Sequence, residues 1–575
     1  MTRPGWTSRR RWMLWLFGLK PEAVDDPKAG ETASAGILML QVDGLSRRQF
    51  ERAIGGRGKL PFLRRLVSRQ GWRLESFYSG IPSTTPAVQA ELFYGVRTAV
   101  PAFAFFDKSD ARAVEMIQPA AAAAVERRCQ RLGEGLLRGG SSHSNIYTGG
   151  AREAHLCPAA LDGTLPGPAR LGWWRWTLAL VWNFPAVVRT VGALLIEYAI
   201  LLADFSRGRV TRGDFHAELA SVPKRMAVAV LMREWIVVGA ELDLTRGLPI
   251  VHANFLGYDE QSHGRGPESA IAHWSLRQID RAIRRIVRAA RRSPVREYQV
   301  WVYSDHGQEA TLPFEEYRGM SLPELVRELV AGIGGASPIE RPDDSPIPGG
   351  RPEKGRSGGS RAQGSRAQGI GSRAQGIHGH GIRGQRAGWI GGPWTRSFAG
   401  LADAMSRVVS SEEDGICVVA KGPLGHVYLG EGWDAARKRE LGSRLATEGR
   451  VPWVFFIDPR DGWLAWHGGD RYRLPADRDR LIPPGQPFAD VILTDLETTC
   501  RHRDAGDLVV CGWQIEGPTV SFVHERGGHA GPGPEETHGF ILVPPDARPG
   551  DTLAPGVWRP GDLRAAILGR SQAGS

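Results

Sequence analysis

Side chains that bind metal ions or act as nucleophiles occur in five separate segments of the chain. Aspartate and histidine supply the oxygen and nitrogen ligands that divalent ions such as zinc bind well. A threonine hydroxyl beside such an ion can act as a nucleophile, because coordination favours its deprotonated form. This combination predicts metal-assisted displacement at an electrophilic centre. In chain order, the candidate residues are Asp43, Thr84, Thr85, Asp259, His263, Asp305, His306, His529 and His538.

None of these segments is specific when it is taken alone. Asp43-Gly44 is a common turn dipeptide. A hydroxyl residue such as Thr84 or Thr85 at the start of a helix is most often a cap. The same helix start attracts anions, so a phosphate group would also fit there. The occurrence of all five segments in one chain is therefore the stronger signal.

The spacing within the later segments favours metal binding. Asp259 and His263 are four positions apart, so one helical turn can direct both side chains at one ion. Asp305-His306 follows a strongly apolar segment, and the carboxyl edge of an open α/β sheet is where ligands bind. His529 and His538 lie in a glycine-rich segment, in which the backbone can approach an ion or a phosphate closely.

Alternating strands and helices must position these residues. Apolar runs at 36–42, 248–256 and 298–303 predict buried parallel strands, and helical spacing occupies 60–70 and 269–290. This alternation predicts an α/β fold with a mostly parallel central sheet flanked by helices. Further strands are expected at 415–420, 425–429, 451–457, 507–511 and 519–523.

The 575 residues exceed what one compact core usually holds, so insertions are expected. The segment in which Ser-Arg-Ala-Gln-Gly recurs has too few apolar residues to form an ordered core. The expected parts are an N-terminal tail at 1–35, a first part of the catalytic core at 36–345 with a helical Trp-rich insertion at about 108–247, a low-complexity disordered loop at 346–392, an inserted α/β cap region at 393–490, and the final part of the core at 491–575.

Composition argues against several classes of protein. The net charge of +11 is spread widely, so no specific nucleic-acid partner is expected. Five cysteines without CxxC spacing indicate neither a disulfide framework nor a cysteine metal site, and they favour a cytoplasmic location. Charged residues and Pro185 interrupt the apolar zone at 173–205, so no transmembrane helix is expected. Its tryptophans either pack in the core or face a membrane surface, which leaves peripheral membrane association open.

Taken together, the segments resemble the alkaline-phosphatase superfamily and, within it, the type I phosphodiesterase/nucleotide pyrophosphatase-like branch. The resemblance covers residues 37–106, 249–309 and 505–545, and it implies an alkaline-phosphatase-like core with inserted cap regions. The matching motifs are Asp43-Gly44 after the first strand, Pro82-Ser83-Thr84-Thr85 with Gly95 ten residues later, Asp259 and His263 with Gly266-Pro267, Asp305-His306-Gly307 after a strand, and Gly527-Gly528-His529.

The resemblance implies a phosphoric ester hydrolase with two divalent metal ions. Zinc is expected from the ligand types, and manganese is compatible with the same ligands. Thr85 would be the metal-activated nucleophile, and a phosphothreonine or nucleotidyl-threonine intermediate would form on it. By this resemblance, one ion would be held by Asp259, His263 and His529, and the other by Asp43, Thr85, Asp305 and His306.

Two alternatives stay open within this assignment. Thr84 could be the nucleophile, although the spacing of the motif favours Thr85. His538 could replace His529 as the late metal ligand, although the Gly-Gly-His-Ala-Gly context favours His529.

The chain departs from the family pattern beside the nucleophile. Diesterase-type members often carry an asparagine three residues after it, and Val88 occupies that place here. Gln89 is the expected substitute, and together with Thr84 it is a candidate for substrate binding. The expected substrate is a small-molecule phosphoester of the nucleotide or phospholipid-headgroup type. The alternatives are a phosphomonoesterase or phosphosugar mutase on the same core, and a non-catalytic interaction protein on this scaffold.

Overall fold

The computed structural model describes most of the chain. Beyond isolated positions between 188 and 230, the described residues are 35–55, 58–161, 232–333, 386–387, 409–413, 415–430, 432–483, 485–547 and 552–573. The predictions for the N-terminal tail, for most of the Trp-rich zone and for most of the repeat segment therefore fall outside the described residues. No helix within these ranges is long and apolar enough to cross a membrane.

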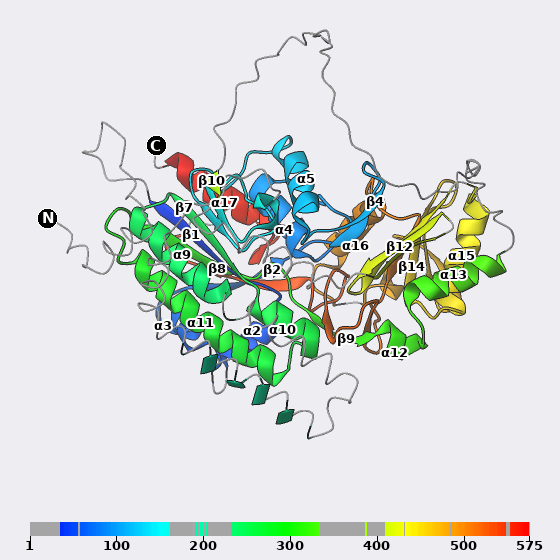
Figure 1. Cartoon of the computed structure of the whole chain (residues 1–575), viewed down its shortest axis with the longest axis horizontal. Helices are drawn as coiled ribbons and strands as arrows, with labels where there is room; N and C mark the ends of the chain where they lie inside the picture. The colour runs from blue at the N-terminus through cyan, green and yellow to red at the C-terminus, as the bar shows by residue number, and fades with distance from the viewer. Residues whose placement is uncertain are drawn as a thin grey trace, which may run out of the picture.

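A nine-stranded sheet forms the centre of the molecule (Figure 1). Neighbouring strands run parallel from β10 through to β8, whereas β20 is antiparallel to both of its neighbours. This arrangement confirms the predicted α/β class with a mostly parallel sheet. In spatial order, the strands are β10 (Arg386–Ala387), β6 (Glu153–His155), β5 (Ser141–His143), β7 (Ile250–Phe255), β1 (Gly36–Val42), β8 (Tyr298–Tyr303), β20 (His538–Val543), β2 (Arg73–Tyr78) and β21 (Val557–Trp558).

Strand β1 is buried over its whole length, because helices cover both faces of the sheet. Side chains alternate between the faces, so Leu38 and Leu40 join one hydrophobic cluster and Ile37 and Met39 join the other. The first cluster includes residues of α2 (Arg47–Ile54), α3 (Pro61–Arg69), α9 (Arg233–Arg246), α10 (Gly257–Arg265) and α11 (Ala270–Ala290), and the second includes residues of α4 (Thr85–Tyr94), α5 (Pro119–Gln130) and α17 (Pro560–Ala573).

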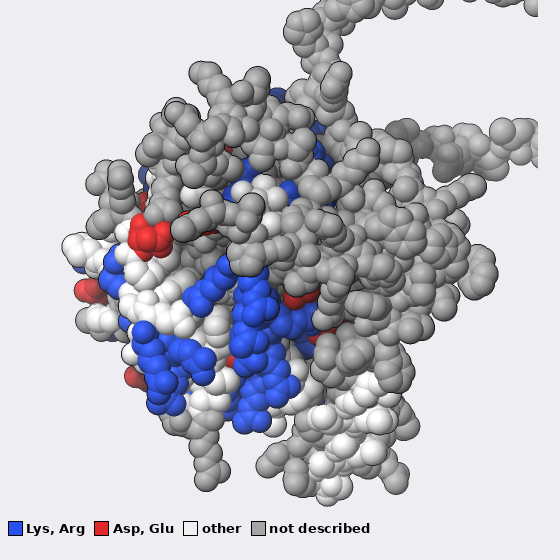
Figure 2. Space-filling view, turned by 90° about the vertical axis from the view of Figure 1, so that its left-hand side faces the viewer, with Lys and Arg blue, Asp and Glu red and all other residues white. Residues whose placement is uncertain are grey.

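Helix α11 shows how the basic charge is accommodated. Its buried residues, including Leu276, Ile279 and Ile283, recur with helical spacing and face the sheet, while arginines take the positions between them. Figure 2 views the side of the molecule on which α3, α9 and α11 lie, and it shows Lys and Arg side chains gathered there. The exposed arginines of α11 are Arg277, Arg281, Arg284 and Arg288.

Strand β20 comes from the last part of the sequence, yet it lies inside the central sheet. It pairs with β8 on one side and with β2 on the other, in a register that runs from Arg73 opposite Val543 to Tyr78 opposite His538. Strand β2 therefore has no direct pairing with β1, β7 or β8 and is joined to them through β20.

A second, antiparallel sheet of seven strands is packed between helices. Helices α13 (Leu322–Gly332) and α15 (Ala435–Thr447) contribute to the cluster on one face, and α16 (Ala489–Cys500) contributes to the cluster on the other. In spatial order, the strands are β11 (Val409–Glu413), β12 (Ile416–Lys421), β13 (Leu424–Leu429), β17 (Leu508–Cys511), β14 (Trp453–Asp458), β15 (Gly462–His467) and β16 (Asp470–Arg473).

The strand order of the two sheets differs from two of the expected domain boundaries. Strand β17 lies in the middle of the second sheet, although the sequence places residues 491–575 in the catalytic core. Strands β5 and β6 belong to the central sheet, although they fall within the insertion expected at about 108–247. Local periodicity identifies a strand but not the sheet that it joins, because pairing partners are distant in sequence.

A three-stranded sheet brings the late histidine segment towards the end of β8. Strand β9 (Glu309–Pro313) pairs with β18 (Thr519–Ser521) on one side and with β19 (Gly527–Gly528) on the other. The residue after β19 is His529, and the residues before β9 are Asp305 to Gln308. The smaller elements are the hairpin β3 (Ala104–Asp107) and β4 (Arg112–Glu115), helix α12 (Phe314–Arg318), and the 3-10 turns at Pro158–Ala160 and Arg478–Arg480.

Candidate metal centre and active site

Two neighbouring parallel strands deliver carboxylates to the same edge of the central sheet. Asp43 directly follows β1, and Asp305 is the second residue after β8. Both carboxylates are almost completely buried. The turn after Asp43 requires glycine, because Gly44 has a φ of +70° and a Cβ there would lie 2.4 Å from Asp259 Oδ1. The turn thus brings the end of β1 against the start of α10.

The N-terminus of α4 presents Thr85 to these carboxylates. Thr85 Oγ1 lies 3.2 Å from His306 Nε2 and 3.4 Å from Asp43 Oδ1. Thr84 is the N-cap of the helix, and its buried hydroxyl has no hydrogen-bond partner among the described residues. Of the two threonines, Thr85 is therefore the one whose hydroxyl is in contact with candidate metal ligands.

Helix α10 and the segment after β19 complete the cluster. His263 Nε2 lies 3.3 Å from Asp259 Oδ2, as the four-residue spacing predicts, and His529 Nε2 lies 3.9 Å from Asp259 Oδ1. The rings of His306 and His529 stack with centroids 3.9 Å apart. The ligand atoms of two overlapping groups lie within 4.8 Å of one another, and the groups are Asp259, His263 and His529, and Asp43, Asp259 and His306.

The three histidines make the same kind of hydrogen bond. Nδ1 of each ring lies next to a backbone carbonyl oxygen: that of Gly527 at 2.9 Å for His263, Gly307 at 2.9 Å for His306, and Ser83 at 2.8 Å for His529. Because a carbonyl oxygen only accepts hydrogen bonds, Nδ1 carries the hydrogen in each case. Each ring can therefore direct the Nε2 lone pair at the cluster, which is the usual arrangement of metal-binding histidines.

The electrostatics of the carboxylates also favour a cation. Burial, together with the charges of Asp305 and Asp259, raises the pKa of Asp43 well above its usual value. Burial also raises the pKa of Asp305, and neither of its oxygens has a hydrogen-bond partner among the described residues. Burial opposes ionisation of Asp259, but His263 outweighs this effect and lowers its pKa. A divalent ion would compensate the buried negative charge, so these residues fit the expected metal ligands.

Two other predicted residues lie elsewhere. Gln89 is fully buried and donates to Asn145 Oδ1 at 3.0 Å while it accepts from the Ile146 N–H at 2.8 Å, so it supports a loop and does not line the cavity. His538 starts β20 and its Nε2 lies 3.0 Å from Ser76 Oγ, away from the histidine cluster.

Several residues that contact the candidate metal ligands were not predicted from the sequence. Asn254 Nδ2 donates to Asp43 Oδ2 at 2.6 Å, Gln308 donates to Asp259, and Glu525 Oε2 lies 2.9 Å from His263 Nδ1. Gln308 stands next to Asp305-His306-Gly307, so its position in the motif could have indicated a role. Asn254 and Glu525 carried no such signal, because only the tertiary fold brings them to the ligands.

A cavity opens beside Thr85 and the metal ligands. Its polar lining includes Asn145 and Lys421, and Lys421 pairs with Glu115 and lies 4.4 Å from the centroid of the Phe103 ring. One wall of the cavity therefore offers both a cationic side chain and apolar side chains. The apolar lining consists of Phe103, Ile117, Ile146, Leu156, Pro158, Met232 and Leu256.

Removing the negative charge that supports His263 is expected to weaken metal binding. In Glu525→Gln, His263 keeps its shape and its contact with the Gly527 carbonyl but loses the carboxylate at Nδ1. We expect metal affinity to fall about 10- to 100-fold, measured by competition with a metal-binding dye. Glu516→Gln changes an exposed glutamate of the same region and should leave the affinity unchanged. Equal affinity in both variants would contradict a supporting role for Glu525.

Two neighbouring glutamates, the buried Glu536 and the partly buried Glu309, predict a pH-dependent stability. Burial raises the pKa of Glu536 to about 8 and that of Glu309 to about 7. Because these pKa values lie above the usual 4.5, the stability from the protonated forms is present at low pH and is lost as the pH rises towards 8. At constant zinc, Tm should fall between about pH 5 and about pH 8, and it should fall less in Glu536→Gln. Parallel Tm profiles of the two proteins would refute this assignment.

Comparison with known proteins found one matching family model. The family model of type I phosphodiesterase / nucleotide pyrophosphatase matches residues 201–354, which include Asp259, His263, Asp305 and His306. The match indicates a hydrolase of phosphoesters. More particularly, it confirms the resemblance to the alkaline-phosphatase superfamily and to its type I phosphodiesterase/nucleotide pyrophosphatase-like branch. No curated protein sequence shows significant similarity to the chain.

Solved structures were also matched, at low similarity. Phosphonoacetate hydrolase from Sinorhizobium meliloti 1021, in complex with phosphonoformate, is 14% identical, with 94% of this chain and 96% of that chain covered and a TM-score of 0.41. Murine ectonucleotide pyrophosphatase / phosphodiesterase 5 is 9% identical, with 93% and 94% covered and a TM-score of 0.42. An inactive form of the murine protein was solved in complex with AMP. Likeness at this level does not bear on the function of this chain.

Proposed function

We propose that the chain is a two-metal phosphodiesterase of the nucleotide pyrophosphatase type with Thr85 as its nucleophile. The observation that carries the proposal is that the Thr85 hydroxyl lies beside Asp43 and His306, which share a candidate metal group with Asp259, while Asp259 also joins His263 and His529. The match to the phosphodiesterase family model supports the reaction class. A non-catalytic scaffold would have no need to keep every ligand aimed at one place.

The proposed ligands form two sets. The metal ions, zinc or manganese by ligand type, would stabilise charge on the attacking and leaving oxygens of the phosphoester. The proposed ligands of one ion are Asp259, His263 and His529, and those of the other are Asp43, Thr85, Asp305 and His306.

Thr85 and the start of α4 have different roles in the proposed reaction. The Thr85 hydroxyl gives up its proton as its oxygen attacks phosphorus, the bond to the leaving alcohol or phosphate breaks and the leaving oxygen takes up a proton, and the phosphoryl or nucleotidyl group is left on Thr85. The dipole at the start of α4 would stabilise the phosphate oxygens. Water then attacks the same phosphorus and releases Thr85. Burial of the cluster keeps the attacking group oriented and limits competing water.

The lining of the cavity suggests how the substrate is held. Val88 belongs to the hydrophobic core, so it cannot take the place of the phosphate-binding asparagine. Asn145 brings an amide to the cavity instead, and its orientation is fixed because it donates to Ser142 Oγ at 2.7 Å and accepts from Gln89. Lys421 and the apolar wall would accept an anionic group and the base of a nucleotide, or a lipid headgroup.

The diesterase assignment is tested by comparing bis-(p-nitrophenyl) phosphate with p-nitrophenyl phosphate. We expect kcat/KM to be higher for the diester, and the activity to disappear with a chelator and return with zinc or manganese. Turnover of the monoester alone would favour the phosphomonoesterase alternative. No bound ion after zinc loading would overturn the two-metal mechanism.

A further inference from the structure

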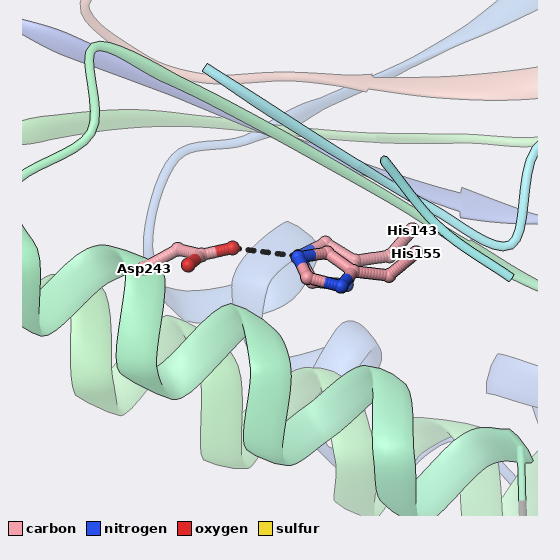
Figure 3. Close-up of side chains that lie close together, drawn as sticks. All are labelled: His143, His155 and Asp243. Atoms are coloured by element: carbon pink, nitrogen blue, oxygen red, sulfur yellow. Dashed lines mark hydrogen bonds and ion pairs between the residues drawn. The ribbon is translucent and has the colours of Figure 1, made fainter. Parts of the chain in front are cut away.

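A second group of metal-ligand side chains lies away from the active site. His143 ends β5 and His155 ends β6, and the two residues are directly paired across these parallel strands. Their rings stack with centroids 4.7 Å apart and an interplanar angle of 13°. Asp243 approaches from α9, and its Oδ2 lies 2.8 Å from His143 Nε2 (Figure 3). All three side chains are buried, with at most 2% of their surface exposed.

The surroundings of this group are charged, and hydrogen bonds and ion pairs already orient them. Arg246 donates to Asp243 Oδ1 at 3.2 Å and to the two oxygens of Glu153 at 2.6 and 2.8 Å. Glu153 Oε2 lies 3.9 Å from His155 Nε2. Arg152 also lies 3.5 Å from Glu153 Oε1, so the two carboxylates face two guanidiniums. Burial, with a contribution from His143, lowers the pKa of His155 to about 3, so this imidazole is neutral at neutral pH.

We propose that His143, His155 and Asp243 bind a third divalent ion of the zinc class, at a structural site distinct from the active site. Their ligand atoms lie within 4.8 Å of one another, and two imidazoles with one carboxylate suit zinc. The His143–Asp243 hydrogen bond explains two of the three residues. A shared cation also explains why a second imidazole is held beside the same carboxylate. Arg246 fixes the other carboxylate oxygen, as outer residues of metal sites do.

This site lies directly behind one wall of the active-site cavity. The residues that follow His143 and His155 line the cavity, and among them Ser144 and Leu156 have φ values of +59° and +57°. Residues other than glycine rarely adopt this left-handed backbone conformation, so both turns must be held by their surroundings. Met232, which precedes α9, lines the same cavity. An ion that joins β5, β6 and α9 would fix all three segments of the wall.

Metal stoichiometry tests the proposal on the full-length protein. Zinc-loaded protein is freed of excess metal, and bound zinc per chain is measured by mass spectrometry. His155→Gln should hold one zinc ion fewer than the wild-type protein. The matched control is His252→Gln, because His252 is fully buried on the adjacent strand β7 and its Nε2 lies 2.7 Å from the Tyr303 hydroxyl. His252→Gln should match the wild-type protein. Equal zinc content in His155→Gln and the wild-type protein would overturn the proposal.

A measurement on the wild-type protein decides the question if His155→Gln does not fold. Crystals of the zinc-loaded protein are measured on both sides of the zinc absorption edge. We expect an anomalous peak between the two imidazoles and Asp243, separate from any peak near Thr85. Its absence at saturating zinc would disprove the structural site. Because the two locations are resolved individually, the outcome does not depend on whether the active site binds metal as proposed.

Discussion

Thr85→Ala is expected to lower kcat for a phosphodiester by about a thousandfold or more, which corresponds to roughly 4 kcal/mol in activation free energy. The substitution removes the only proposed nucleophile but leaves Asp43, Asp305 and His306 in place. The protein should therefore still bind both metal ions. Steady-state kinetics and metal analysis of the same preparation separate loss of the nucleophile from loss of the metal.

Two variants serve as controls for this result. Thr84→Ala removes the neighbouring hydroxyl, which makes no hydrogen bond to a described residue, and it should keep most of the activity. Thr85→Ser retains a hydroxyl at the same place and should be much more active than Thr85→Ala. Full activity in Thr85→Ala, or its loss in Thr84→Ala with normal folding, would transfer the nucleophilic role to Thr84.

His529→Ala is expected to lose one of the two active-site ions and to lower kcat/KM by about a hundredfold or more, because the attacking and leaving oxygens would no longer be stabilised together. His529 Nε2 faces Asp259, and its Nδ1 is fixed by the Ser83 carbonyl. His538→Ala is the matched control, because this second histidine of the same glycine-rich segment lies beside Ser76 instead. Zinc content and kcat/KM are measured for both variants.

The opposite result would be equally informative. If His538→Ala loses the ion and His529→Ala does not, the late ligand is His538 and the segment between them adopts another arrangement when metal is bound. If neither variant changes zinc content, neither histidine is a metal ligand.

The sequence predicted the α/β class and several elements closely, because these elements are buried and local. The runs at 36–42 and 298–303 form β1 and β8 with the same bounds, and the carboxyl ends of both strands carry Asp43 and Asp305. Asp259 and His263 also come together through one turn of helix, which depends only on their spacing. For these residues, knowledge of the local element was enough to predict proximity.

Features that depend on distant pairing were not accessible in the same way. Strands β5 and β6 look like part of an insertion until their partners are known. Gln89 follows the nucleophile in the helix, yet its amide is used by the loop at Asn145, which joins the site only through the fold. Glu525 gave no local signal, because its contact with His263 spans 262 positions. The roles proposed for the site residues stay predictions until the variants are measured.

The position of β20 has a consequence for the order in which the chain can fold. During synthesis, β1, β7 and β8 can pair once residue 303 has emerged, but β2 has to wait for β20, which separates it from β8. Ser76 and His538, which touch in the finished protein, are 462 positions apart. Such late, long-range pairing slows folding and leaves an open strand edge in the meantime. His529 emerges just before β20. A nascent chain that has not reached His529 therefore lacks both the complete central sheet and the full set of candidate ligands. Hydrolytic competence is thus expected only after His529 and β20 have been synthesised.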